Sequence, residues 1–105
     1  MEIANIQSNK KWLLGVEGSR SPIEIGHFEI PNDQYHYHEK VYEYYIVYVG
    51  ELTIVIDGKE TVLNTGSICC VEPFEKHEVI SGSKDLKCFL LKFPHLPDDK
   101  IIVSV

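Results

Sequence analysis

Residues 44–63 read YYIVYVGELTIVIDGKETVL. The stretch is rich in Tyr, Val, Ile and Thr, the residue types that suit the pleated surface of a β-sheet. Gly50-Glu51 interrupts it, which predicts two strands that meet at a tight turn or bulge. Asp57-Gly58 lies between two further strand-like runs, and this pair is a strong hairpin signal because both central positions need positive φ.

The rest of the chain continues this pattern of short strands and turns. Residues 64–66 and 81–83 are expected turns, and residues 67–71, 79–80 and 88–93 are expected strands. Residues 23–25 and 28–30 alternate weakly. Residues 6–14 are the one segment open to a helical interpretation, but their apolar spacing is poor. Many short strands with frequent turns are typical of an all-β antiparallel sandwich or barrel.

Length and composition predict one globular domain over residues 1–105. The chain has 44% hydrophobic and 25% charged residues, and its apolar runs are too short to span a membrane. The first residues are polar after Met1-Glu2-Ile3, so we expect no secretion signal. Because a short chain buries a modest core, oligomerisation would hide extra apolar surface.

The charge balance argues against nucleic acid and anionic lipid as partners, since 16 acids outnumber 10 bases. Arg20 is the only arginine, so a site that clamps phosphate or carboxylate with forked guanidinium groups has one candidate at most. The three cysteines are odd in number and have no C-x-x-C spacing, which favours a reduced, cytoplasmic setting.

The segment HYHEKVYE, residues 36–43, carries the strongest functional signal. In a strand, His36 and His38 project to one face, so both imidazoles can reach one metal ion. Glu43 lies an odd number of positions beyond His38, and a loop through residues 39–42 would reset the phase and return its carboxylate to the histidines. His77 follows an expected turn over residues 73–76 and is well placed to be the fourth ligand.

Other chemically active residues have plainer interpretations. His27 and His95 have no motif partner and are expected at the surface or in turns. Of Cys69 and Cys70, adjacent on one strand, one should face the interior and one away. Glu72 and Glu75, beside Pro73, are expected in a solvated turn. If Glu43 faces inward, Tyr45 shares its side and is the candidate pocket residue. The four His and Glu residues themselves could also be a polar lining that never holds metal.

With these motifs the sequence resembles the cupin superfamily. His36, His38, Glu43 and Gly50 satisfy the spacings of its first motif, and Gly66, Pro73 and His77 fit the second. Three positions depart from the pattern: Ile30 and Phe74 replace glycines, and Ser81 replaces an asparagine. These departures concern turn geometry rather than ligation. The resemblance covers residues 34–93, approximately, which is well over half of the chain.

The resemblance implies a small double-stranded β-helix, a jelly-roll-like antiparallel barrel that is usually a homodimer. It also implies a divalent metal held by His36, His38, Glu43 and His77. Mixed imidazole and carboxylate ligation suits manganese, iron, nickel, cobalt or zinc, and the sequence does not choose among them. Four protein ligands leave one or two open positions in a five- or six-coordinate ion.

Three functions remain open at this point, since one fold hosts many activities. The first is a metal-dependent enzyme acting on a small oxygen-rich molecule, as an oxygenase or decarboxylase, or as a sugar isomerase or epimerase. The second is a binding module for a small ligand such as a carbohydrate, because the sequence looks similar to small cupins grouped with mannose-6-phosphate isomerase. The third is an interaction module that presents tyrosine-rich edge strands to a partner.

Overall fold

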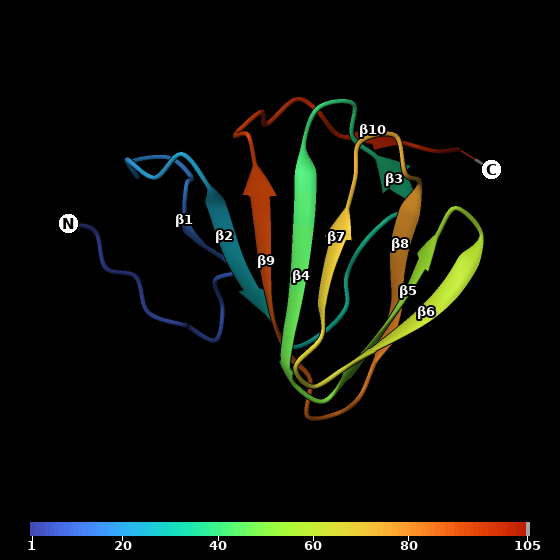
Figure 1. The fold of residues 1–105 in the computed structure, drawn as a ribbon. Helices are drawn as coiled ribbons and strands as arrows, with labels where there is room; N and C mark the ends of the chain where they lie inside the picture. The colour runs from blue at the N-terminus through green and yellow to red at the C-terminus, as the bar shows by residue number, and fades with distance from the viewer. Residues whose placement is uncertain (105) are drawn as a thin grey trace.

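Ten β-strands form two antiparallel sheets of five strands each, which face one another in the computed structural model (Figure 1). The structure describes residues 1–104 and contains no α-helix in that range. It therefore holds no helix long and apolar enough to cross a membrane among those residues. The all-β prediction is confirmed.

Chain crossovers between the sheets produce the spatial order of the strands. The first sheet runs in the order β1 (Trp12–Leu14), β2 (Glu24–Phe28), β9 (Lys87–Phe93), β4 (Tyr42–Val49) and β7 (Ile68–Val71). The second runs in the order β10 (Ile101–Ile102), β3 (His36–Tyr37), β8 (His77–Gly82), β5 (Glu51–Ile56) and β6 (Lys59–Asn64). Consecutive strands such as β4 and β5 belong to opposite sheets, as in a jelly roll.

The predicted turns around β5 are confirmed. Gly50 has a φ of 85° and separates β4 from β5, which redirects the chain from one sheet to the other. Asp57 and Gly58 have φ values of 48° and 82°, and they close the hairpin in which Ile56 lies opposite Lys59. Two successive positive φ angles are the geometry that Asp-Gly favours in two-residue hairpins.

The turn expected at residues 81–83 is placed wrongly. Ser81 and Gly82 belong to β8 and pair with β5, and the turn comes after them, where the amide of Leu86 donates to the carbonyl of Ser83. Gly82 is needed for packing rather than for turning, because a Cβ there would lie 2.6 Å from Cδ2 of Leu86. A glycine inside a strand often marks such a close approach.

Residues near the N-terminus form an edge of the first sheet. Of the two weakly alternating segments, residues 23–25 and 28–30, the first overlaps the start of β2 and the second only its last residue, Phe28, so residues 29–30 lie outside the strand. Residues 6–14 are not helical and contribute β1.

The core lies between the two sheets. Val47 of β4 and Leu52 and Ile54 of β5 are fully buried, and Tyr45 is 2% exposed. Along β4 the same alternation turns Glu43 inward with Tyr45 and Val47. Inward-facing positions of β4 therefore supply both the core and a carboxylate, and that carboxylate leads to the site.

Candidate metal centre

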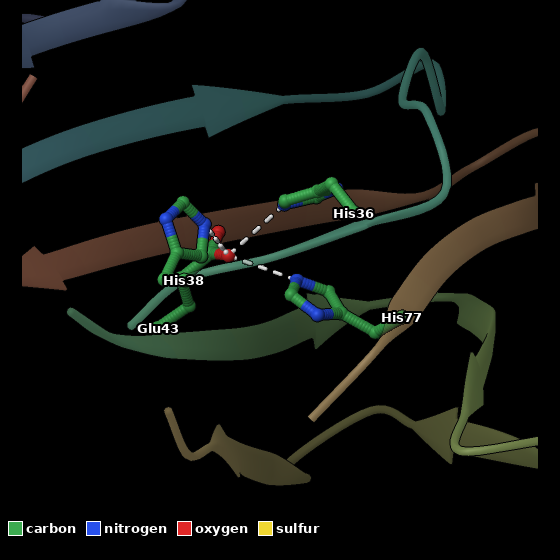
Figure 2. Close-up of side chains that lie close together, drawn as sticks. All are labelled: His36, His38, Glu43 and His77. Carbon is green, nitrogen blue, oxygen red and sulfur yellow. Dashed lines mark hydrogen bonds and ion pairs between the residues drawn. The ribbon is translucent and has the colours of Figure 1, made fainter. Parts of the chain in front are cut away.

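Two histidines on strands of the second sheet, and a third just after one of these strands, meet one glutamate from the first sheet. His36 on β3 lies directly opposite His77 on β8, so strand pairing brings their rings together. His38 follows β3 immediately, and Glu43 reaches across from β4. Figure 2 shows the three imidazole rings arranged around the Glu43 carboxylate. The loop predicted between His38 and Glu43 is present and returns the carboxylate to the histidines.

The group is almost completely withdrawn from solvent, since none of the four side chains is more than 4% exposed. Oε1 of Glu43 lies 2.6 Å from Nε2 of His38, 2.8 Å from Nε2 of His77 and 3.3 Å from Nε2 of His36. One donor atom from each residue falls within 4.8 Å of the others, so the four could hold one metal ion. Polar groups buried to this degree need partners or a bound cation.

The opposite ring nitrogen of each histidine is held by the backbone. Each Nδ1 lies against a carbonyl oxygen, and the pairs are His36 with Gln34 at 2.5 Å, His77 with Glu75 at 2.9 Å, and His38 with Asp99. Because a carbonyl oxygen can only accept, each Nδ1 carries a proton and donates it. In the neutral ring, Nε2 then presents a lone pair towards Glu43. Metal-binding histidines are oriented by this kind of hydrogen bond.

The donor set therefore fits a cation. In the neutral state three nitrogen lone pairs face one carboxylate oxygen, an arrangement that a proton or a metal ion must stabilise. Nε2 of His38 is buried and has no hydrogen-bond partner of acceptable geometry, although Oε1 of Glu43 is close. A buried ring nitrogen without a partner is unfavourable, and coordination of a metal ion would satisfy it.

The electrostatics of the group agree with this description. Burial by itself would raise the pKa of Glu43, but the ring nitrogens of the three histidines gathered on its carboxylate hold that pKa well below its usual range. Burial also opposes the charged form of His77, yet its hydrogen bond and attraction to Glu43 raise the pKa of His77. Glu43 is therefore a carboxylate at neutral pH, the charge state in which it can bind a metal ion.

A cavity of about 240 Å³ adjoins His36 and Glu43. Its apolar walls are Trp12, Phe28, Tyr45, Val79 and Leu90, and its charged lining beside Glu43 consists of Lys11, Asp33, Lys92 and Lys100. A second cavity of about 150 Å³ touches the other side, at His38 and Asp99. A small molecule in the first cavity would lie beside the four-residue group, as in sites where a few polar groups orient a ligand within apolar walls.

Tyr45, the pocket residue expected from strand alternation, lies in the wall of this cavity. Burial, followed by the negative charges of Glu43 and Asp33, raises the pKa of Tyr45 well above its usual value. The phenol therefore stays protonated across the physiological range and can donate a hydrogen bond into the cavity.

Asp99 is a site residue that sequence reasoning missed. Its carboxylate accepts hydrogen bonds from the amides of Glu39, Lys40 and Val41, at 3.0, 2.8 and 2.9 Å. Its own carbonyl accepts from Nδ1 of His38. Asp99 thus fixes the loop that joins His38 to Glu43, and no local pattern in the sequence connects it with residues some sixty positions earlier.

The remaining candidates lie outside the group. His27 was expected at the surface or in a turn, and this is wrong: it lies in β2, is 6% exposed, and its Nε2 is 2.8 Å from the hydroxyl of Tyr48. The ring is covered because Phe89 of the neighbouring strand β9 and Tyr48 of β4, the next strand along, pack on it. His95 is exposed, as expected.

The expectations for the cysteines and the acidic turn are confirmed. Cys69 packs against the core while Cys70 is exposed, as strand alternation requires. Glu72 and Glu75 form a turn in which the amide of Glu72 donates to the Glu75 carboxylate at 2.7 Å.

Comparison with known proteins identifies a family. The family model described as "Cupin domain" matches residues 23–92, a segment that contains all four members of the group. No curated protein matches the sequence.

Solved structures resemble the fold at low sequence identity. The Streptomyces protein Pac13, described as a nucleoside dehydratase, has 16% identity and a TM-score of 0.72, with 96% of this chain and 85% of that chain covered. A protein from Planctomyces limnophilus has 16% identity and a TM-score of 0.74, with 97% of each chain covered. An RmlC-like cupin from Methanocaldococcus jannaschii, with a double-stranded β-helix fold, has 21% identity and a TM-score of 0.69, covering 90% of this chain and 92% of that one.

Proposed function

This chain belongs to the cupin family, and from that premise we propose that it is a metal-dependent enzyme acting on a small oxygen-rich molecule. His36, His38, Glu43 and His77 would hold one divalent transition ion. The observation that carries the proposal is the convergence of three Nε2 atoms on Oε1 of Glu43 while each Nδ1 is fixed by a carbonyl.

The ligand types define a class of metal ions and do not select one member of it. Imidazole and carboxylate ligands together suit manganese, iron, nickel, cobalt and zinc. When bound, such an ion supplies Lewis-acid polarisation of a substrate oxygen. Oxygenase or decarboxylase chemistry and sugar isomerase or epimerase chemistry are the two reaction classes we propose.

The protein's own residues would prepare the substrate. Tyr45 remains a neutral phenol, so it can donate a hydrogen bond to a substrate oxygen in the cavity. Trp12, Phe28 and Leu90 give part of the cavity apolar walls, and a substrate packed against them would lose water there. Reduced hydration strengthens each polar contact inside the site.

Metal content tests the proposal directly. Wild-type protein produced under metal-replete conditions should contain close to one transition ion per chain by elemental analysis. His36→Ala and the near-isosteric Glu43→Gln should lose most of it, because each removes a converging ligand. His95→Ala is the matched control, since His95 lies outside the group. Absence of metal from the wild type, or retention in both site variants with unchanged circular dichroism, would refute the assignment.

A binding module without turnover is the alternative function, with a carbohydrate as one candidate ligand. The observation that favours a carbohydrate ligand is Trp12, which forms an aromatic wall of the cavity. A thermal-shift panel of sugars and carboxylic acids separates the two proposals. A ligand that stabilises the protein and is recovered unchanged after long incubation supports binding, whereas its conversion supports catalysis.

A homodimer, a cytoplasmic location and a role as an interaction module complete the proposals. Ile68, on the edge strand β7, is 68% exposed, and such an edge is a natural place for a second copy. Cys69, Cys70 and Cys88 are free thiols, which supports a reducing compartment. Light scattering tests the dimer, and a strict monomer would contradict it.

A further inference from the structure

Three lysines from distant parts of the sequence line the cavity beside the candidate metal centre. Lys11 precedes β1, Lys92 lies on β9 and Lys100 precedes β10. Figure 1 places β1 and β9 in the same sheet and β10 in the other, so the three come together only in the folded chain. The chain has nine lysines, and a third of them are at this one opening.

Lys92 points towards the interior of the fold. On β9, Cys88 and Leu90 are buried core residues, and strand alternation puts Lys92 on their side. Lysine rarely occupies an inward position without a partner because its charge loses hydration there. Its two cross-strand neighbours are acidic, Glu24 on β2 and Glu43 on β4.

The carboxylates of Glu24 and Glu43 contact histidines rather than the ammonium group of Lys92. Glu43 faces the three histidines, and Glu24 lies 3.4 Å from Nδ1 of His95. The third acidic group, Asp33, lies 3.7 Å from Nζ of Lys100. Among residues 1–104, Lys92 and Lys11 have no carboxylate oxygen within 4.0 Å of Nζ.

Both ammonium groups lie over the ring system of Trp12. Nζ of Lys11 is 5.4 Å from the centre of the Trp12 ring system, and Nζ of Lys92 is 5.2 Å from it. Both distances lie within the range of cation–π attraction. Burial lowers the pKa of Lys11, and the repulsion of Lys92 and Lys100 acts in the same direction against the attraction of Asp33 and Glu43.

We propose that this cavity binds a small anion, carrying a carboxylate or phosphate group, that is held by Lys11 and Lys92 with support from Lys100. This proposal rests on the proposed function, because it names the class of substrate that the same site would bind. With Glu43 bound to a divalent ion, the cavity carries excess positive charge, and an anionic substrate would neutralise it. Lysine binds either group as a point charge, so the scarcity of arginine excludes forked clamps but not this site.

Binding of defined probes tests the anion site. L-malate, its uncharged diamide and inorganic phosphate would be titrated calorimetrically into metal-loaded and metal-free protein. Lys92→Gln and Lys11→Gln should weaken binding of an anion by tenfold or more. Lys84→Gln, in the exposed turn between β8 and β9, is the matched control and should leave the affinity unchanged. Malate and phosphate are separate arms, so the preferred one identifies the anionic group.

The outcomes separate the two proposals. Equal affinity for malate and its diamide, equal loss in Lys84→Gln and Lys92→Gln, or no anion binding at millimolar concentration would overturn the anion site. Elemental analysis of the same samples reports on the metal independently. A wild type that takes up no metal but binds an anion through Lys92 would refute the proposed function and support the anion site.

Discussion

Phe74 occupies a backbone conformation that suits glycine. Its φ is 70°, and it lies in the turn between β7 and β8, just ahead of His77. The cupin pattern has a glycine at this point, and the departure noted in the sequence thus falls on a turn with left-handed geometry. The amide of Phe74 donates to the carbonyl of His38 at 2.6 Å, so the turn is tied to the site.

Replacing Phe74 should reveal the backbone strain. The side chain is 62% exposed and its ring stacks on Tyr37 at 6.2 Å. Phe74→Ala removes that stacking but keeps a Cβ at positive φ, whereas Phe74→Gly removes both. We expect Phe74→Gly to be more stable than Phe74→Ala by about 1 kcal/mol, because left-handed φ disfavours any residue with a Cβ. Thermal denaturation of the two variants measures this difference, and equal stability would contradict the strain.

Residue spacing predicted which side chains would meet, but not how they are held. The positions of His36, His38, Glu43 and His77 follow from strand alternation and from the motif. The hydrogen bonds from each Nδ1 to a carbonyl did not follow, because the acceptors depend on the local path of the backbone. These acceptors decide which nitrogen faces Glu43.

At the level of elements, the loop between His38 and Glu43 depends on a residue near the C-terminus. The carboxylate of Asp99 accepts three amide hydrogen bonds from residues 39–41. Burial opposes the charged form, but these bonds lower the pKa of Asp99, so it is ionised at neutral pH. A loop with three fixed amides has little freedom to move the carboxylate of Glu43.

Asp99→Ala should therefore lower the metal affinity, although the Asp99 side chain is not itself one of the candidate ligands. We expect metal affinity to fall about tenfold, the low end for residues that orient ligands, and stability to fall by about 1 kcal/mol, because water replaces part of the lost hydrogen bonding. Isothermal titration with Ni²⁺ measures the affinity. Asp98→Ala, which removes the same charge one residue earlier, is the control. The same metal affinity in both variants would argue against a role of the Asp99 hydrogen bonds in positioning the ligands.

Strand elements were predicted well where alternation or turn chemistry was strong. The hairpin at Asp57-Gly58 and the break at Gly50 are present as expected. The end of β8 was not predicted, because Gly82 looks like a turn residue in the sequence while its place in the structure depends on the side chain of Leu86. The burial of His27 was missed for a similar reason, since rings from other strands cover it.

For the whole molecule, metal binding should alter the pH dependence of stability. In the metal-free protein the lowered pKa of Glu43 stabilises the fold above the carboxyl's unfolded pKa, and this contribution is lost as the pH falls. The raised pKa of His77 stabilises below about 6.5, and this contribution is lost as the pH rises through the folded value. Together these two groups stabilise the metal-free protein most under mildly acidic conditions, whereas the pKa of His27, lowered by its burial, favours stability at higher pH.

Added metal should show the opposite trend, because protons compete for the histidines. At a fixed free metal concentration, set to one hundred times the Kd measured at pH 7.5, we expect stabilisation of about 2.7 kcal/mol at pH 7.5 and much less at pH 5.5, where protonation of the histidines raises Kd. Scanning calorimetry with and without Ni²⁺ at both pH values measures this. His36→Ala should show little effect of metal at either pH. Equal or larger stabilisation of the wild type at pH 5.5 would contradict coordination by neutral imidazoles.

Local sequence patterns were enough to predict the all-β class, the main hairpin, the family and the four residues of the candidate metal centre. These features depend on local chemistry: strand alternation, turn residues with positive φ, and ligand types at fixed spacing. Tertiary structure alone decided that Asp99 would fix the loop and that Lys11, Lys92 and Lys100 would meet at one cavity. Such contacts join residues from different strands and sheets, and their proximity depends on sheet order and side-chain packing, which no local pattern specifies.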